Sequence, residues 1–116
     1  VVAVCPVDIL TPDRGVAALV DGDQVALFLL SDGRVFAVQN RDPFSGAQVM
    51  SRGITGSRAD EPTIASPVYT QVFSLVTGEC LNAQDSEPRP GLSPHLVTYP
   101  VTVDNGQVHL HLASRL

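Results

Sequence analysis

The sequence predicts an all-β fold of antiparallel strands in one domain. Short runs rich in Val, Leu and Phe alternate with turns rich in Gly, Asp, Asn and Pro, which is typical of antiparallel sandwiches. No stretch places apolar side chains at the three- and four-residue spacing of a helix. A chain of 116 residues is long enough to bury one core of its own. We therefore expect a single antiparallel sandwich spanning residues 1–116.

The N-terminal third predicts a meander of three strands. Val1–Cys5 is apolar and rich in valine, and a loop with Pro and Gly separates it from a strand at Val16–Val20. The Asp21-Gly22 pair predicts a tight turn into Gln24–Leu30, whose nearly continuous apolar side chains indicate a strand buried on both faces. A second turn leads into a strand at Arg34–Val38, so the last three strands should pair in sequence order.

The middle of the chain is predicted to be mostly irregular. Residues 41–62 hold many Gly, Ser, Asp, Arg and Pro residues without a sustained period, which indicates a long excursion with a function or inherited from one. Thr63–Ala65 and Val72–Leu75 are expected as short strands on either side of a second loop. Residues 82–95 carry three prolines, which exclude a helix and are typical of a covering loop.

The C-terminal segment holds the clearest hairpin. Leu96–Val103 and Gln107–Leu112 are predicted strands joined by Asp104-Asn105-Gly106, and Asn-Gly is a preferred centre of a tight hairpin turn. In the second of these strands, valine and leucine alternate with glutamine and histidine. One face of this strand should therefore be apolar and the other polar.

The charge balance excludes several classes of partner. The chain has 12 acidic and 7 basic residues, a net charge of −5 and no lysine, so no basic patch for nucleic acid or an anionic membrane surface is expected. No apolar run approaches the ~20 residues that span a bilayer. The first ten residues lack the basic region of a signal peptide. These features favour a cytoplasmic location.

The cysteines and histidines do not follow a pattern for catalysis or metal binding. Cys5 and Cys80 are expected to be buried, reduced thiols that act as small hydrophobic residues. His109 and His111 share one strand face and could present two imidazoles to a metal, but a solvated polar face is the favoured interpretation. His95 lies in the proline-rich segment and is expected to be structural. Nucleophile elbows and glycine-rich phosphate loops are absent from the sequence.

Two proline-containing loops follow a shared pattern. The first reads Asp42-Pro43-Phe44-Ser45-Gly46, and the second reads Ser66-Pro67-Val68-Tyr69 and continues through Phe73 to the turn Thr77-Gly78. This pattern resembles the loops Cys-Pro-His-x-Gly and Cys-Pro-x-His-Gly-x-x-Phe that bind the iron–sulfur cluster of Rieske proteins. The resemblance implies a Rieske-like sandwich in which residues 41–80 form a smaller, loop-bearing subdomain.

By this resemblance, the four ligand positions are held by Asp42, Phe44, Ser66 and Tyr69. A Rieske centre needs two thiolates and two imidazoles, and these loops offer neither. We expect the Phe44 and Tyr69 rings to fill the volume of a cluster, with Asp42 and Ser66 bonded to loop amides. A hard metal ion held by Asp42 and Tyr69 is disfavoured because one carboxyl and one phenol form a poor cage. The resemblance therefore implies a chain without a cofactor or metal of its own.

Further phrases resemble the small subunit of NAD(P)H-dependent nitrite reductase, a Rieske-like family without a cluster. These phrases are Val49-Met50-Ser51-Arg52-Gly53, Ala65-Ser66-Pro67 and Phe73–Leu81. The resemblance implies a non-redox subunit without catalytic residues that supports a large subunit carrying FAD, sirohaem and an iron–sulfur cluster. Such an enzyme reduces nitrite to ammonia with NADH or NADPH in nitrogen assimilation.

The resemblance also implies where this large subunit would bind. Rieske domains present their loop end to redox partners, which places the contact surface around Ser45, Arg52, Val68 and Gln71. A second hypothesis is a Rieske-type electron-transfer ferredoxin or oxygenase component, which the missing ligands disfavour. A third is a free-standing module that binds a small molecule, which the lack of converging polar residues disfavours.

Overall fold

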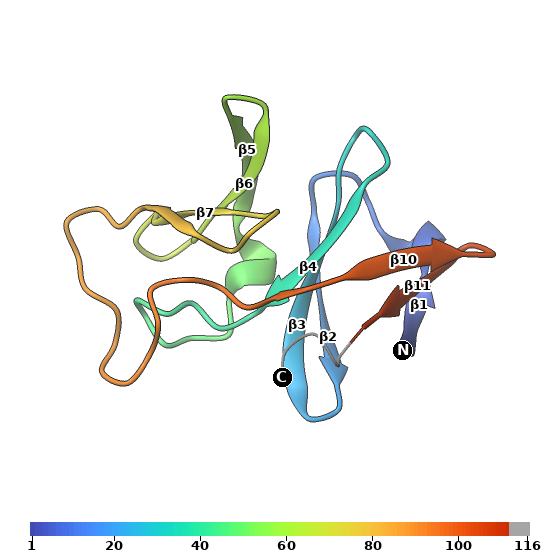
Figure 1. The fold of residues 1–116 in the computed structure, drawn as a ribbon, viewed down its shortest axis with the longest axis horizontal. Coiled ribbons are helices and arrows are strands. Elements are labelled where there is room, and N and C mark those ends of the chain that lie inside the picture. Colours follow the sequence, from blue (N-terminus) through green and yellow to red (C-terminus); the bar gives the residue numbers. More distant parts are fainter. Residues whose placement is uncertain (112–116) are drawn as a thin grey trace.

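The computed structural model describes residues 1–111. In it the chain folds into three antiparallel sheets (Figure 1). The first sheet has the order β1-β11-β10 and the second the order β2-β3-β4-β9. The third and smallest has the order β5-β6-β7-β8. The all-β antiparallel prediction is thereby confirmed. In these residues no helix combines the length and apolarity needed to cross a membrane.

The second sheet is the centre of the molecule, and its first three strands are the predicted meander. They are β2 (Gly15–Val20), β3 (Asp23–Leu29) and β4 (Val35–Gln39), and β9 (Thr98–Tyr99) pairs with the outer edge of β4. Four consecutive residues of β3, from Val25 to Phe28, are fully buried. The prediction of a strand buried on both faces is therefore confirmed.

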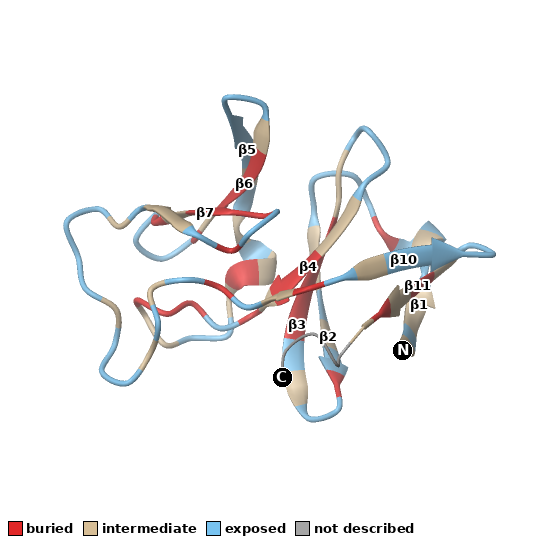
Figure 2. Cartoon of the chain, in the orientation of Figure 1, coloured by how far each residue is buried: buried red, intermediate tan, exposed pale blue. Residues whose placement is uncertain are grey.

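The alternation of β3 divides the interior into two cores. Val25 and Leu27 pack into one core, whereas Ala26 and Phe28 pack into the other. Successive side chains of a strand point to opposite faces, so one strand contributes to both cores. Figure 2 shows this burial running along β3 and β4 between the two halves of the molecule.

The first core lies between the central sheet and the first sheet. That sheet consists of β1 (Val2–Pro6), β10 (Val101–Asp104) and β11 (Gln107–Leu110), with the short 3-10 helix η1 (Val7–Ile9) after β1. On β11 the valine and leucine are fully buried and the histidine is only half-buried. The predicted alternation is confirmed within the described residues, and Leu112 lies outside them.

The second core joins the central sheet to the third sheet and to the first proline loop. The third sheet consists of β5 (Ile54–Arg58), β6 (Glu61–Ala65), β7 (Val72–Ser74) and β8 (Cys80–Asn82). The core residues it shares with the central sheet and the loops are Ala26, Phe28, Val38, Phe44, Met50, Ile64, Phe73, Leu75 and Leu96. The small sheet therefore has no separate core, and the position of the loops depends on the central sheet.

The hairpin β5–β6 corrects the prediction that residues 41–62 are irregular. Four of the five β5 side chains are exposed, so the strand carries no apolar alternation that a sequence could reveal. Its turn is formed by Ala59 and Asp60 at φ +50° and +69°, although such turns usually contain Asn and Gly. Met50–Arg52 also forms a 3-10 helix, η2, within the same segment.

The prediction of a single strand at Leu96–Val103 is also wrong. Pro100 separates β9 from β10, and the two strands belong to different sheets. Proline has no N–H to donate to a sheet and is therefore found at interruptions of this kind. The short strand β8 was also not predicted, since its three residues are too few to show a period.

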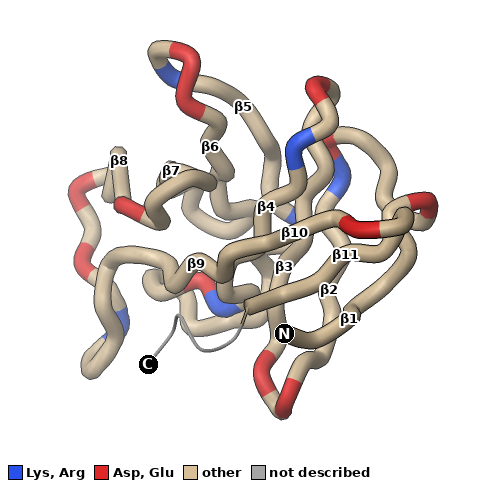
Figure 3. The backbone as a smooth tube through the Cα atoms, turned by 45° about the vertical axis from the view of Figure 1, so that its right-hand side comes forward, with Lys and Arg blue, Asp and Glu red and all other residues tan. Residues whose placement is uncertain are grey.

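Charged residues are distributed over the connecting loops (Figure 3). Asp and Glu positions lie at many of the turns, and the Arg positions are separated from one another along the chain. Within the described residues the one ion pair joins Arg34 to Asp32 at 2.8 Å, with both side chains exposed. This part of the surface therefore offers no basic patch to a phosphate backbone.

Candidate functional site

The first loop, residues 41–48, is a closed turn that holds its own side chains in place. Asp42 N donates to Ala47 O at 2.8 Å, and Gly46 N donates to Asp42 O at 2.7 Å. Gly46 has φ +80°, a conformation that glycine adopts without strain. Asp42 Oδ1 accepts a hydrogen bond from Phe44 N at 2.8 Å. The predicted bond between Asp42 and a loop amide is confirmed.

The second loop, residues 66–71, is closed by hydrogen bonds of its own. Ser66 N donates to Gln71 O at 2.9 Å, and Val68 N donates to Ser66 Oγ at 3.2 Å, which confirms the predicted bond of Ser66 to a loop amide. Thr70 stands where the Rieske pattern has glycine and has φ +60°. A β-branched residue is strained in this region, and such strain is typical of functional loops. The Gln84 side chain holds Thr70 through bonds to its carbonyl and hydroxyl oxygens.

The two loops are joined by one buried hydrogen bond between side chains. Ser66 Oγ donates to Asp42 Oδ2 at 2.5 Å, and the two residues are 1% and 0% exposed. These are the two positions at which Rieske proteins carry the thiolates that bind one iron. A hydroxyl-to-carboxyl bond therefore connects the loops where a shared metal ion connects them in a Rieske centre.

The two aromatic residues at the imidazole positions have different surroundings. The Phe44 ring is buried in the second core and meets the Phe73 ring at a centroid distance of 6.1 Å and an interplanar angle of 50°. Tyr69 is 60% exposed, so its predicted role as a packed ring is wrong. Tyr69 lies at the tip of its loop, whereas Phe44 follows a buried carboxyl that anchors the turn. The apolar filling thus comes from the first loop.

The four residues predicted to bind a partner are not equally accessible. Val68 is 42% exposed and Ser45 is half-buried. Arg52 is exposed, but it belongs to η2, which packs against β2 and β3 at the middle of the molecule. Gln71 is 0% exposed, so its prediction as a surface residue is wrong. It immediately precedes β7, and its backbone pairs with Ser66, which turns the side chain inward.

The donor atoms of the loops do not fit a [2Fe–2S] cluster. Such a cluster needs four thiolate or imidazole ligands, and the loops supply two buried oxygen-bearing side chains, a phenyl ring and an exposed phenol. Cys5 and Cys80 are unpaired thiols on β1 and β8, outside both loops. Among the described residues no three His, Cys, Asp or Glu side chains converge as a metal-binding group.

His95 and His111 each have a hydrogen-bond partner among the described residues. Cys80 N donates to His95 Nδ1 at 3.0 Å, a contact that sequence reasoning missed because 15 residues separate the two. The bond is consistent with the structural role predicted for His95. His111 Nε2 lies 3.1 Å from Thr102 Oγ1 on the first sheet. This contact ties the His111 ring to the neighbouring strand.

The proline-rich segment at residues 82–95, which was expected to be a covering loop, lies against the first loop. Arg89 N donates to Pro43 O at 2.8 Å, and the Arg89 side chain lies beside Gly46. A backbone bond to a proline carbonyl uses the one hydrogen-bonding group that proline retains. The segment therefore covers one side of the first loop.

Two glycines of the nitrite reductase phrases are required by close backbone approach. A Cβ at Gly53 would lie 2.4 Å from Ala65 O, and one at Gly78 would lie 2.0 Å from Leu96 O. Gly78 also has φ +81°, which L-residues with side chains rarely adopt. These two glycines allow the close packing of the backbone around the site. The sequence phrases that contain them therefore belong to the scaffold that supports the two loops.

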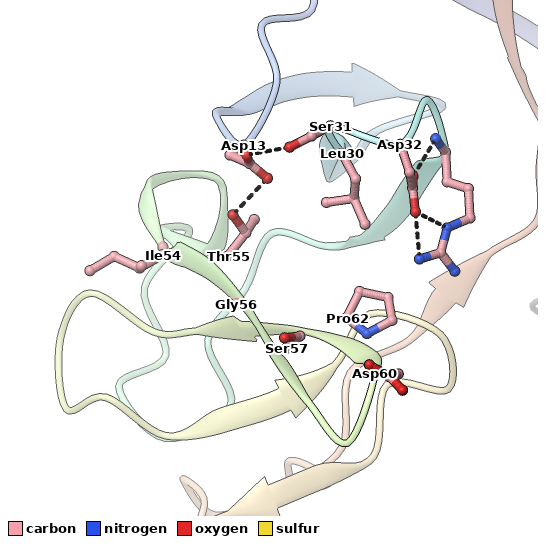
Figure 4. A pocket seen from close by; sticks show the side chains of 12 residues that line it. Asp13, Leu30, Ser31, Asp32, Ile54, Thr55, Gly56, Ser57, Asp60 and Pro62 are labelled. Carbon is pink, nitrogen blue, oxygen red and sulfur yellow. Dashed lines mark hydrogen bonds and ion pairs between the residues drawn. The ribbon is translucent and has the colours of Figure 1, made fainter.

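An open groove of about 640 Å³ lies between the β3–β4 turn and strand β5 (Figure 4). On one side Asp13 accepts hydrogen bonds from Ser31 Oγ at 3.1 Å and Thr55 Oγ1 at 3.2 Å. On the other side the backbone N–H and guanidinium of Arg34 hold the pKa of Asp32 below its usual range. Since these polar groups are largely paired with one another, the groove shows no arranged catalytic set.

Cys5 and Cys80, which were expected to be buried, are half-buried, whereas Tyr99 is buried, and burial changes the acidity of all three groups. It raises the pKa of the Cys5 thiol and of the Tyr99 phenol. The pKa of the half-buried Cys80 thiol is also raised, first by burial and then by the neighbouring Glu79 carboxylate. Each group is therefore kept in its uncharged form when the chain is folded.

We expect stability to fall at alkaline pH for this reason. A raised pKa in the folded state contributes stability that is complete below the unfolded pKa, about 8.5 for Cys and about 10 for Tyr, and is lost as pH rises through the folded value. Urea midpoints should be level near pH 7 and should decline above about pH 8.5. Because the chain has no lysine, lysine deprotonation does not obscure the decline. A variant with Cys5→Ser, Cys80→Ser and Tyr99→Phe should lose most of it, and an equal decline in that variant would contradict the assignment.

Comparison with known proteins identifies relatives over nearly the whole chain. A family model described as a Rieske-like [2Fe–2S] domain matches residues 1–111. The nitrite reductase (NADH) small subunit of Salmonella typhimurium is 42% identical over 79 residues, covering 67% of this chain and 73% of that one. A solved structure of a candidate NADH-dependent nitrite reductase small subunit from Mycobacterium tuberculosis is 46% identical with a TM-score of 0.80, covering 94% of this chain and 91% of that one.

Two further relatives have different names. A region of the nitrite reductase [NAD(P)H] large subunit of Klebsiella oxytoca is 34% identical over 106 residues, which is 91% of this chain and 10% of that protein. This chain thus spans about a tenth of the length of that relative. The 3-phenylpropionate/cinnamic acid dioxygenase ferredoxin subunit of Photorhabdus laumondii is 33% identical over 107 residues, covering 92% of this chain and 90% of that one.

Proposed function

Because this chain belongs to the Rieske-like [2Fe–2S] domain family, and within it to the nitrite reductase small subunits, we propose that it is a non-redox subunit of an NAD(P)H-dependent nitrite reductase. The observation that carries this proposal is the buried bond between Ser66 and Asp42. It joins the loops at the thiolate positions with groups that cannot hold the iron of a Rieske cluster. This chain therefore has no electron-relay step of its own.

The catalytic chemistry is proposed to lie on a large subunit. That subunit would carry FAD, sirohaem and an iron–sulfur cluster and would reduce nitrite to ammonia with electrons from NADH or NADPH, for nitrogen assimilation. This chain would bind it and support its assembly, stability or activity. The proposed location is the cytoplasm, where unpaired thiols such as Cys5 and Cys80 remain reduced.

The Klebsiella relative supports the large subunit as partner. There, a region similar to 91% of this chain is part of the same polypeptide as the rest of a nitrite reductase large subunit. A domain that is covalently linked to its neighbour binds it at a high effective concentration. A separate chain must bind the same neighbour through the affinity of the interface alone. In this structure the N-terminus lies on the side of the first sheet, away from the two loops (Figure 1). A covalent connection at this end would leave the loops free to bind.

The loop tips are the proposed contact surface. Val68 and Tyr69 are adjacent, 42% and 60% exposed, and lie on the strained second loop next to the first loop. Exposed tyrosine is enriched among the residues that dominate binding energy at interfaces. We therefore place the contact at Val68, Tyr69 and Ser45, with Arg52 at its margin and Gln71 beneath it.

Tyr69→Ala is expected to weaken recovery of the large subunit by a tagged form of this chain by about tenfold or more in affinity. Removing the ring should leave the fold intact because the side chain makes little buried contact. Leu19→Ala is the matched control, since Leu19 is 73% exposed and belongs to β2 of the central sheet, not to either loop. Equal recovery by the two variants would place the interface elsewhere.

Native co-purification tests the proposed function as a whole. A tagged chain expressed in its own organism should recover a large subunit whose complex shows flavin and sirohaem absorption. A complex that reduces nitrite with NADH or NADPH would agree with the proposal. Recovery of an oxygenase without any nitrite reductase would favour the ferredoxin function instead.

The ferredoxin function is the second candidate, because the Photorhabdus relative is a ferredoxin subunit at 33% identity. Overall sequence identity does not distinguish the two functions, whereas the donor atoms of the loops do. A carrier needs a cluster, whereas Phe44 has no donor atom and Tyr69 is directed to solvent.

Iron–sulfur reconstitution separates these two candidates directly. We expect the anaerobically purified chain to be colourless and to take up no stoichiometric iron, since oxygen ligands do not replace thiolates and imidazoles in a Rieske centre. A Rieske ferredoxin treated in parallel provides the positive control. Two irons per chain with a Rieske-type spectrum would overturn the non-redox assignment.

A further inference from the structure

The side chain of Gln71 is buried without a hydrogen-bond partner. It is 0% exposed, and among residues 1–111 neither its Oε1 nor its Nε2 atom has a hydrogen-bond partner. A primary amide has one acceptor oxygen and two N–H donors. Leaving such a buried group unpaired costs about 1–3 kcal/mol, and buried polar groups are therefore almost always bonded.

The strand pairing shows where this amide points. Ile64 pairs with Phe73 and Ala65 with Val72, and the next bond along the ladder runs from Ser66 N to Gln71 O. Opposed residues of an antiparallel pair place their side chains on the same face, and alternate residues of one strand share a face. Gln71 therefore lies on the face of Ser66 and of Phe73.

This face is directed toward the first loop. Phe73 on it meets the Phe44 ring, and Ser66 on it bonds to the Asp42 carboxyl. The strand ladder therefore directs the Gln71 side chain to the face of the second loop that carries Ser66 and is turned toward Asp42. All three polar side chains are at most 1% exposed, so whatever satisfies the amide must be internal and small.

The bonds already made between the loops define what is missing. Asp42 Oδ1 and Oδ2 each accept one hydrogen bond, from Phe44 N and Ser66 Oγ, and each oxygen retains a second lone pair. Ser66 Oγ donates once and accepts once, from Val68 N. The unused capacity consists of acceptors on Asp42 and Gln71 and the N–H donors of Gln71.

We propose that one water molecule is bound between the loops, accepting from Gln71 Nε2 and donating to the Asp42 carboxyl. Water is neutral and carries both donors and acceptors, which matches this mixed set. An anion at this position would be repelled by the Asp42 carboxyl group. A metal cation would leave the Gln71 N–H donors unpaired and would find too few oxygen ligands. A hydrated amide and carboxyl thus occupy the position that a cluster holds in Rieske relatives.

The direct test is a crystal structure of the full chain at a resolution that reveals ordered water. We expect one water within hydrogen-bond distance of both the Gln71 amide and the Asp42 carboxyl. A Gln71 amide bonded directly to protein atoms, or a metal ion at this position, would overturn the proposal. By NMR, the Gln71 side-chain amide should show cross-peaks to a long-lived water, whereas exposed Gln48 should not. The absence of such peaks at Gln71 would also count against it.

A substitution gives an independent result through the sign of its effect. Gln71→Met keeps the length of the side chain and removes the amide. If water bridges the amide, the urea midpoint should fall, because the water loses a partner in a buried site. If the amide is unpaired, the midpoint should rise, because an unsatisfied group has been removed. An unchanged or higher midpoint would refute the bridge, and Gln48→Met serves as the exposed control.

Discussion

Phe44→Ala is expected to lower the free energy of unfolding by about 3–5 kcal/mol. The Phe44 ring is 5% exposed, packs against Phe73, and belongs to the core that the first loop shares with the central and third sheets. Truncation removes the buried apolar surface of the ring and leaves a cavity that the rigid turn around Asp42 cannot close. Since a domain is stable by only about 5–15 kcal/mol, this loss should be evident in urea denaturation.

Tyr69→Ala is the matched control for this prediction, because it removes a ring from the equivalent position of the other loop. With 60% of Tyr69 exposed, its loss should change the free energy of unfolding by less than about 1 kcal/mol. A midpoint for Phe44→Ala that equals the midpoint for Tyr69→Ala would show that the first loop is not part of the core.

Ser66→Ala is expected to have the next largest effect, about 2–3 kcal/mol of destabilisation. The substitution removes the donor to Asp42 Oδ2 and the acceptor of Val68 N in one step. Leaving a buried group without a partner costs about 1–3 kcal/mol, and the Asp42 carboxyl is 0% exposed. The same bond connects the two loops, so its loss should also increase amide exchange at both loops.

Ser45→Ala makes the same chemical change at a site where little loss is expected. Ser45 Oγ accepts from Ala47 N at 3.2 Å in an exposed bond within the first loop. The Ser66→Ala, Asp42→Asn double variant provides a further check, because interacting groups show non-additive effects. If the effects of Ser66→Ala and Asp42→Asn on the free energy of unfolding are additive, the Ser66–Asp42 bond does not couple the two loops. An effect of Ser45→Ala as large as that of Ser66→Ala would contradict this bond in the same way.

The loops explain how a Rieske-like domain keeps its shape without the ligands of a cluster. A metal centre joins two loops by sharing one ion between them. Here a buried hydroxyl-to-carboxyl bond joins them, and a phenyl ring fills the adjacent space. The scaffold residues around them, such as Gly78 with its close approach to Leu96, hold the backbone in the same arrangement. The two-loop shape can thus be kept by side chains that are not cluster ligands.

Much of the fold could be predicted from local patterns. The continuous apolar run in β3 indicates burial on both faces of the strand. The alternation of apolar and polar residues in β11 indicates burial on one face. Both patterns can be read directly from the sequence. The hairpin β5–β6 could not be predicted in this way. Most of β5 is exposed and the turn at Ala59 and Asp60 lacks the usual residues, so neither hydrophobic period nor turn chemistry marks it.

Within the site, the types of donor atom follow from the amino-acid sequence, whereas the directions in which these atoms point depend on the tertiary structure. Asp42, Phe44, Ser66 and Tyr69 exclude the ligands of a cluster by chemical type alone. The resemblance to Rieske loops placed the Tyr69 ring inside and Gln71 at the surface, and the structure reverses both. The physical reason is position: Tyr69 lies at the tip of a turn, whereas Gln71 is held by a backbone bond to Ser66 that directs its amide inward.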